Sequence, residues 1–172
     1  MAMIRVLTDA DASELYELRL RALQESPEAF GSTYAETVLR GVESYRQRLQ
    51  QPLTENFILG AYSSSDTLVG MVAFFRDTGE KDRHKGYIVS MYVEPESRGQ
   101  GMGRALVGEA IAHARQVPDV VQLQLAVVTS NVAARHLYLS LRFVVYGLEP
   151  RALRLGEDQY WDEELMILRL DE

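Results

Sequence analysis

Hydrophobic residues recur along the chain at two spacings, which predict where strands and helices lie. Short runs rich in β-branched and aromatic residues are typical of strands. The turn cluster at residues 63–67 separates two such runs, which predicts a hairpin. The predicted strands are residues 3–7, 56–62, 68–76, 86–93, 120–128, 142–147 and 160–170.

Helical spacing dominates four other segments. Residues 8–26 place Leu15, Leu18 and Ala22 on one face, and Thr8 or Asp9 can cap this helix. Pro27 and Gly31 then interrupt the pattern over residues 26–37. The other predicted helices are the polar segment 41–51 and the amphipathic segments 103–116 and 131–141, whose apolar faces hold Leu106, Val107, Ala110, Ile111 and Ala114 and then Ala133, Ala134, Leu137, Tyr138 and Leu141.

The order of these elements indicates the fold class. One strand, two helices and three strands are followed by a helix, a strand, a helix and two strands. Interspersed helices and strands of this kind predict an α/β or α+β fold with a mixed sheet. Residues 1–172 contain no repeat or linker that would divide them, so we expect a single domain.

Composition narrows the function classes. The net charge of −7 argues against nucleic-acid binding and mildly favours a cationic partner such as a polyamine. Cysteine is absent, so neither disulfides nor a thiolate nucleophile are available. No apolar run has the length of a membrane span, and the first residues do not resemble a secretory signal, so we expect a cytoplasmic protein without membrane contact. His84, His113 and His136 are scattered, and no metal site is predicted.

Three alternating glycines, Gly99, Gly101 and Gly103, stand before the third predicted helix, between Arg98 and Arg104. Unpaired N–H groups at a helix N-terminus can hold an anion, and glycine lets the anion come close. The dinucleotide fingerprint is excluded, because its third glycine would fall on Arg104 or Leu106. The Gly-Lys-Ser/Thr of a mononucleotide loop is absent as well.

The same residues resemble motif A of the GNAT superfamily of acetyl-CoA-dependent N-acetyltransferases. Arg98, Gly101 and Gly103 match its Arg/Gln-x-x-Gly-x-Gly/Ala pattern. A second signature of the superfamily follows, and Asn131, Ala134, Leu137 and Tyr138 match it. Arg142 stands where the superfamily usually has glycine. The resemblance implies a mostly antiparallel sheet of six or seven strands flanked by about four helices, the GNAT-like acyl-CoA N-acyltransferase fold, and homodimers are common among such proteins.

The resemblance also implies a set of binding residues for acetyl-CoA. The pyrophosphate would lie on the glycine loop, the pantetheine arm along the preceding strand, and a main-chain N–H of that strand would face the thioester carbonyl. Asn131 can contact the arm and also cap its helix. The implied residues are Met91, Tyr92, Val93, Arg98, Gly99, Gln100, Gly101, Met102, Gly103, Arg104, Asn131, Ala134 and Tyr138.

Tyr138 is the predicted catalytic acid. A phenol, with a pKa near ~10, is protonated at neutral pH and can give a proton to a leaving thiolate, whose thiol has a pKa near ~8.5. Packing at the core edge is the alternative role for this ring.

The general base and the acceptor site are less defined. The strand before the glycine loop has no carboxylate, and Ser90 is its one inward polar candidate. The base is therefore a side chain from elsewhere or a chain of waters. Glu36 is one candidate, although a solvated helix position explains it as well. Phe30, Tyr34, Tyr160 and Trp161 are candidates for lining the acceptor pocket, although packing explains aromatic residues as well.

The resemblance implies an enzyme that transfers acetyl from acetyl-CoA to a primary amine of a small molecule or protein, by direct attack in a ternary complex. The alternative is a non-catalytic acyl-CoA-binding or regulatory module of the same fold. The missing strand carboxylate favours the module, and the presence of Tyr138 favours the enzyme.

Overall fold

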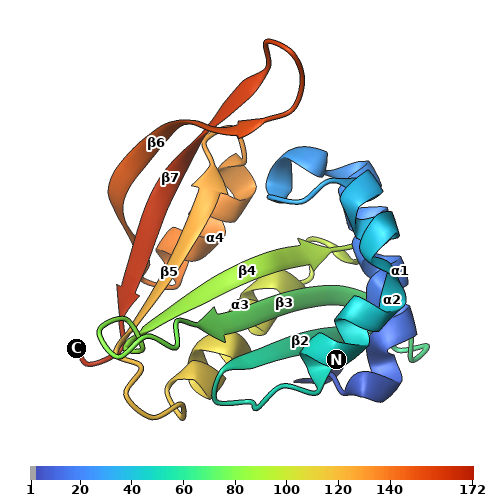
Figure 1. The fold of residues 1–172 in the computed structure, drawn as a ribbon, viewed down its shortest axis with the longest axis horizontal. Coiled ribbons are helices and arrows are strands. Elements are labelled where there is room, and N and C mark those ends of the chain that lie inside the picture. Colours follow the sequence, from blue (N-terminus) through green and yellow to red (C-terminus); the bar gives the residue numbers. More distant parts are fainter. Residues whose placement is uncertain (1–2) are drawn as a thin grey trace.

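A seven-stranded mixed sheet forms the centre of the protein, whose computed structural model describes residues 3–172 (Figure 1). The strand order is β1-β2-β3-β4-β5-β7-β6. Neighbouring strands are antiparallel except β4 and β5, which are parallel. The strands are β1 (Met3–Val6), β2 (Asn56–Tyr62), β3 (Leu68–Arg76), β4 (Lys85–Val93), β5 (Gln122–Val128), β6 (Val144–Arg154) and β7 (Tyr160–Arg169).

Four α-helices and three short 3-10 turns connect these strands in the predicted order. The mixed, mostly antiparallel sheet and the number of helices confirm the expected fold class. The helices are α1 (Ala12–Glu25), α2 (Tyr34–Leu49), α3 (Met102–Ala114) and α4 (Val132–Ser140), and the turns are η1 (Asp9–Asp11), η2 (Pro27–Ala29) and η3 (Pro95–Ser97).

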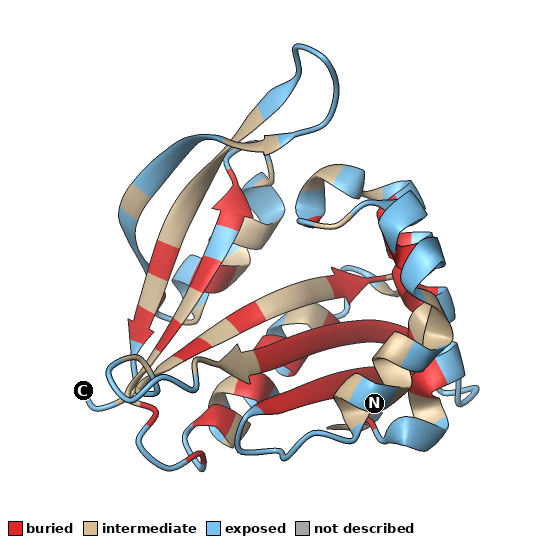
Figure 2. Ribbon diagram, in the orientation of Figure 1, coloured by how far each residue is buried: buried red, intermediate tan, exposed pale blue. Residues whose placement is uncertain are grey.

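The sheet carries one hydrophobic cluster on each face, because successive side chains of a strand point to opposite sides. In β2, Phe57 and Leu59 pack with α3, whereas Ile58 packs with α1. Figure 2 shows β2 and β3 buried along most of their length and β6 largely exposed. The predicted apolar faces of α1 and α3 are confirmed, since Leu15 and Leu18 of α1 and Leu106 of α3 are at most 1% exposed.

The parallel strands β4 and β5 pair only at one end. Lys85–Tyr87 pairs with Gln122–Gln124, and beyond this point the two strands diverge (Figure 1). The edge of β4 that faces β5 is therefore open from Ile88 onward. This opening lies between the carboxyl ends of two parallel strands, where ligands commonly bind in open α/β sheets.

Two predicted boundaries are wrong. Helix α2 begins at Tyr34, inside the segment expected to be irregular, because Thr33 and Glu36 form a capping box. Gly41, with φ of 69°, kinks this helix. Strand β6 extends to Arg154 rather than ending near residue 147, because it pairs with β7 through two register shifts.

Candidate active site

The glycine loop gives α3 an N-terminus with free main-chain donors. Gly99 and Gly101 have φ of 75° and 78°, a region in which side chains other than glycine are strained. Gly101 is the N-cap of α3, and its carbonyl accepts from Ala105 N–H at 3.0 Å. The N–H groups of residues 102–104 precede this bond, so no carbonyl of the helix accepts from them. Together with the helix dipole they can hold an anion.

Gly103 serves a different purpose from the two loop glycines. A Cβ at this position would lie 3.2 Å from Met91 Cε and 3.5 Å from Leu137 Cδ2. The glycine therefore allows α3 to approach both β4 and α4. The alternating pattern thus combines two unusual backbone angles with one close approach between elements.

Arg98 and Arg104 are tied to the protein on either side of this loop. Arg98 donates through Nε to the Val93 carbonyl at 2.8 Å and pairs with Glu25 at 2.8 Å. This pairing lowers the pKa of the Glu25 carboxyl. Arg104 donates to Ser140 Oγ at 2.6 Å. Both guanidinium groups are partly exposed and hold the loop against α1 and α4.

The open edge of β4 presents main-chain groups to the cleft. Glu94 N–H donates to Val69 of β3 at 2.8 Å, and in an antiparallel pair alternate residues bond to the same neighbour. The main-chain groups of Val93 and Met91 therefore point the other way, toward the gap between β4 and β5, where the Val93 carbonyl already accepts from Arg98 Nε. At Ser90 the strand bulges, with φ of 56°. A non-glycine residue in this region is strained and typical of functional sites.

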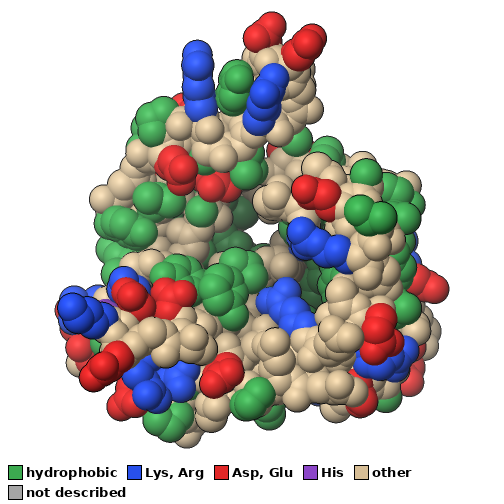
Figure 3. All heavy atoms as spheres, viewed as in Figure 1, with side chains coloured by type: hydrophobic (Ala, Val, Ile, Leu, Met, Phe, Trp, Pro, Cys, Tyr) green, Lys and Arg blue, Asp and Glu red, His purple; other side chains and the backbone are tan. Residues whose placement is uncertain are grey.

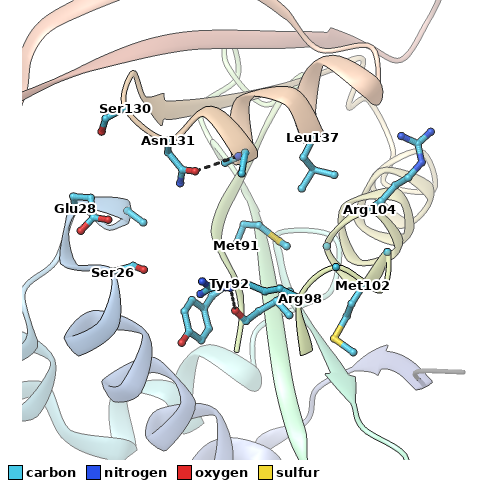
Figure 4. A pocket seen from close by; sticks show the side chains of 17 residues that line it. Ser26, Glu28, Met91, Tyr92, Arg98, Met102, Arg104, Ser130, Asn131 and Leu137 are labelled. Atoms are coloured by element: carbon cyan, nitrogen blue, oxygen red, sulfur yellow. Dashed lines mark hydrogen bonds between the residues drawn. The ribbon is translucent and has the colours of Figure 1, made fainter. Parts of the chain in front are cut away.

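Two cavities meet along this edge. The larger, of about 540 Å³, lies between the glycine loop, β4 and α4, and Figure 4 shows Met91 between the loop and Asn131 and Leu137. It is lined by Ser26, Glu28, Ala29, Met91, Tyr92, Val93, Arg98, Gly99, Gly101, Met102, Gly103, Arg104, Ser130, Asn131, Ala133, Ala134 and Leu137.

The second cavity, of about 340 Å³, occupies the gap between β4 and β5. The space-filling view shows a hollow on this face of the molecule (Figure 3). The cavity is lined by Arg19, Ala29, Phe30, Gly31, Ser32, Ile88, Val89, Ser90, Met91, Ala126, Val127, Val128, Asn131, Ala134, Tyr138 and Glu163. Met91, Asn131 and Ala134 line both cavities, so the two are neighbours across Met91.

Tyr138 is the buried residue of α4 and lines the second cavity. Burial raises the pKa of its phenol above the ordinary value, so the hydroxyl keeps its proton at neutral pH. Asn131 caps the start of this helix, as predicted, because its Oδ1 accepts from Ala134 N–H at 3.1 Å. Ala133, expected to lie on the apolar face, is exposed on the wall of the larger cavity.

Glu163 of β7 is a site candidate that the sequence pattern did not identify. It lines the second cavity together with Tyr138, and it pairs across the sheet with Glu149 of β6. Burial and the nearby Glu149 charge raise the pKa of its carboxyl. In the sequence it stands in the acidic run 162–164, which resembles a solvated strand, so no local signal singles it out.

The remaining predicted residues divide between the cleft and the surface. Phe30 lines the second cavity, where Arg19 lies 4.2 Å above its ring. The lining residues of the two cavities do not include Tyr34, Glu36, Gln100, Tyr160 or Trp161. Glu36 is exposed and accepts from Thr33 N–H at 2.8 Å, which lowers the pKa of its carboxyl. Glu36 therefore caps the N-terminus of α2, and this position does not support a role as the general base.

Residues 3–172 contain neither a metal-binding cluster nor a membrane-spanning helix. No group of three or more His, Cys, Asp or Glu side chains is arranged to hold a metal ion. None of the helices in this range combines the length and apolarity that crossing a membrane requires.

Comparison with known families matches residues 14–143 to the acetyltransferase (GNAT) family. Among curated proteins, the L-amino acid N-acyltransferase MnaT of Escherichia coli K12 is 36% identical over 84 residues. This match covers 48% of the chain and 47% of that enzyme, so the chain spans about half the length of the curated relative.

Solved structures resemble the whole chain. A GNAT-family acetyltransferase of Streptococcus pneumoniae is 25% identical with a TM-score of 0.79, over 98% of this chain and 99% of that one. The Salmonella typhimurium protein yncA, solved with its cofactor acetyl-CoA, is 24% identical with a TM-score of 0.82, over 100% and 95% of the two chains. At 24% identity, the likeness to yncA shows only that the two proteins share a fold.

Proposed function

Because the chain belongs to the acetyltransferase (GNAT) family, we propose that it transfers an acetyl group from acetyl-CoA to a primary amine by direct attack in a ternary complex. One observation carries the proposal. The donor-rich N-terminus of α3, the open edge of β4 and the wall of α4 enclose a single cavity, and a second cavity with Tyr138 adjoins it.

The larger cavity is the proposed donor site. The free N–H groups of residues 102–104 suit the pyrophosphate of acetyl-CoA, and Gly99 and Gly101 leave open space beside them. The cleft-facing main chain of Met91 and Val93 suits the amide-bearing pantetheine arm, which can add to a strand edge. Tyr92, Arg98, Met102, Gly103, Arg104, Asn131 and Ala134 complete the proposed set, in which Gln100 contributes only its place in the loop.

In the proposed reaction the amine nitrogen bonds to the thioester carbonyl carbon, and the carbon–sulfur bond then breaks. A main-chain N–H at Met91 stabilises the oxyanion that forms during attack. The sulfur leaves with the electron pair and takes a proton from the Tyr138 hydroxyl, and the proton that the nitrogen loses as the amide forms restores this hydroxyl. The open β4 edge at Met91 and the position of Tyr138 in the adjoining cavity support these roles.

Glu163 is the proposed proton acceptor for the attacking amine. The amine is mostly protonated at neutral pH, so a base must take its proton. The raised pKa of Glu163 brings this carboxylate closer to the operating pH, which makes it a better base than an exposed glutamate. It also lies on the wall of the cavity that holds Tyr138, so an acid and a base would flank the same space.

A small molecule is the favoured acceptor. The second cavity, of about 340 Å³, has the volume of a small-ligand pocket. The Escherichia coli relative bears the name of an L-amino acid N-acyltransferase, which supports a small amine rather than a protein as acceptor.

The test combines binding with turnover. Release of free thiol from acetyl-CoA is measured over a library of primary amines, and CoA binding is measured separately by calorimetry. Turnover with at least one amine is expected. Tight CoA binding without any turnover would favour the non-catalytic acyl-CoA-binding module. Failure to bind CoA would overturn both the enzyme and the module.

We further propose one domain over residues 1–172, a cytoplasmic location and a homodimer. The proposed donor, acetyl-CoA, is made and used inside cells, which supports the location. Strand β6 ends the sheet and exposes Val144, Val145, Tyr146 and Leu148, and a sheet edge with exposed apolar residues favours pairing. Light scattering after gel filtration tests the dimer, and Tyr146→Glu is expected to give monomers.

A further inference from the structure

Three arginines converge on a small cavity beside the second cavity, which is the proposed acceptor cleft. The cavity, of about 90 Å³, lies between α1, α2 and the centre of the sheet, and Arg19, Arg40 and Arg48 line it. Tyr45, Ser32 and Ser90 add hydroxyl groups to its wall. One water needs only roughly 10–15 Å³, so this space accepts a small polar group.

These arginines have no carboxylate partner. None of the ion pairs formed among residues 3–172 includes Arg19, Arg40 or Arg48. Glu36 lies one helical turn before Arg40, and its carboxylate bonds to the Thr33 N–H instead. Buried charges are normally paired, so the enclosed and unpaired Arg19 and Arg48 indicate that a ligand supplies the negative charge.

Arg19 is fixed in place at the boundary between this cavity and the acceptor cleft. Only 8% of its surface is exposed, and its guanidinium donates to Ser90 Oγ at 3.2 Å and to Ser32 Oγ at 2.9 Å. Arg19, Ser32 and Ser90 line both cavities. Its Nε is buried without a hydrogen-bond partner, which leaves one donor of the guanidinium unused.

Arg48 and Arg40 are supplied by α2, on the two sides of the kink at Gly41. Arg48 donates through Nε to Asn56 Oδ1 at 2.9 Å, an uncharged partner that orients its guanidinium. Burial lowers the pKa of both Arg19 and Arg48, as expected for cations that no carboxylate stabilises. Arg40 is exposed at the cavity mouth, and basic side chains are visible beside the hollow in Figure 3.

We infer that Arg19, Arg40 and Arg48 form a subsite for an anionic group of the acceptor, so that the substrate class is small amines that also carry a carboxylate or an equivalent anion. The inference rests on the proposed function, which it deepens by naming the acceptor. Glu163 and Arg19 line the same cleft, so a negative and a positive side chain face a molecule with an ammonium and an anionic group. The local positive charge reverses the preference for a cationic acceptor that the net charge of −7 favoured.

Matched acceptors and variants test the subsite. Wild type, Arg40→Gln and the control Arg46→Gln are assayed with L-methionine and with L-methioninamide. Arg46 lies on the same helix, pairs with Glu43 and does not line the cavity. Arg40→Gln is used first because it is exposed, whereas substitution of the buried Arg19 can prevent folding.

Wild type is expected to prefer L-methionine, although the amide has the less basic amine. Arg40→Gln is expected to lower kcat/KM for L-methionine by roughly 10- to 100-fold, which is the effect of losing one charge-assisted hydrogen bond. The value of kcat/KM for the amide should change less than twofold. Arg46→Gln should leave kcat/KM unchanged for both acceptors. Equal use of the two acceptors by wild type, or an equal loss for both in Arg40→Gln, would overturn the subsite.

A binding measurement separates the subsite from the reaction. Calorimetry of the CoA-loaded protein with N-acetyl-L-methionine and with its amide requires no turnover. Binding of the carboxylate that is lost in Arg40→Gln supports the subsite even if no amine is acetylated, in which case the proposed function alone fails. Acetylation of amines that lack an anionic group, without binding of the carboxylate, overturns the subsite alone.

Discussion

The main-chain N–H of Phe143 donates to the carbonyl oxygen of Tyr138 over 3.1 Å, and the two rings meet edge to face with centroids 5.9 Å apart. Arg142 N–H donates to Leu139 at 3.0 Å in the same turn. These bonds form a Schellman motif, which ends α4 and includes a hydrophobic contact between its first and last residues. The turn that closes the helix therefore also holds the proposed catalytic acid.

Arg142 occupies the left-handed position of this motif, with φ of 71°, where glycine carries no steric cost. Arg142→Gly is expected to raise the free energy of unfolding by about 0.5–1 kcal/mol, measured by urea denaturation, with kcat unchanged. His136→Gly, at an exposed position inside the same helix, should instead lower it by about 0.3–0.5 kcal/mol. Destabilisation by both substitutions would contradict this account of the turn.

Tyr138→Phe removes the proposed acid and keeps the ring that packs on Phe143. We expect kcat to fall about 100-fold, because general acid catalysis contributes at least that much, while KM for acetyl-CoA changes less than about twofold. Tyr160→Phe removes the hydroxyl of an exposed tyrosine on β7 and should have no effect. Steady-state thiol release measures both, and an unchanged kcat in Tyr138→Phe across pH rules out the acid role.

Glu163 should determine how activity falls at low pH. Because its pKa is raised, the acid limb of kcat/KM should lie above pH ~4.3, the ordinary value for glutamate, and activity is lost as the carboxylate takes a proton. Glu163→Gln should lower kcat about 100-fold and abolish this limb. Glu149→Gln removes a neighbouring negative charge and should move the limb to lower pH. A limb that persists in Glu163→Gln assigns the base to another group.

Gly101→Ala tests the glycine loop, because φ of 78° strains any residue with a side chain. We expect the free energy of unfolding to fall by about 1–2 kcal/mol and KM for acetyl-CoA to rise about tenfold. Gly108→Ala provides the matched control within α3, where a Cβ meets open space and the backbone is helical. That substitution should stabilise the protein by about 0.5–1 kcal/mol and leave KM unchanged.

Asp11 and Arg5 should make stability depend on acid pH. Their ion pair, at 2.7 Å, lowers the pKa of Asp11 to about 2. A depressed pKa contributes stability above the unfolded value of about 3.9, and this contribution is lost as pH falls toward the folded value. Asp11→Asn should therefore cost about 1–2 kcal/mol at pH 7, reduced for the partial exposure of Arg5, and nearly nothing at pH 2. Urea denaturation at both pH values measures this, and a constant difference would contradict it.

Local sequence patterns were sufficient for most of the fold. The order of strands and helices, the apolar face of α1 and the cap at Asn131 follow from interactions within a few residues, so they could be predicted. The start of α2 could not, because Pro27 and Gly31 masked the capping box at Thr33. The full length of β6 depends on its pairing with β7, which the sequence of β6 does not specify.

The sequence by itself determined the proposed donor site of this protein. The role of Gly99, Gly101 and Gly103 could be predicted locally, since a positive φ and a missing Cβ are properties of single residues next to one helix. Only the tertiary structure decided the proposed acceptor site. Arg19 of α1 lines one cavity with Arg48 of α2 and a second cavity with Glu163 of β7, and the second cavity opens where β4 and β5 diverge beyond Tyr87. Contacts between residues so far apart in the chain depend on how the strands and helices are arranged in space, and a local sequence pattern does not specify that arrangement.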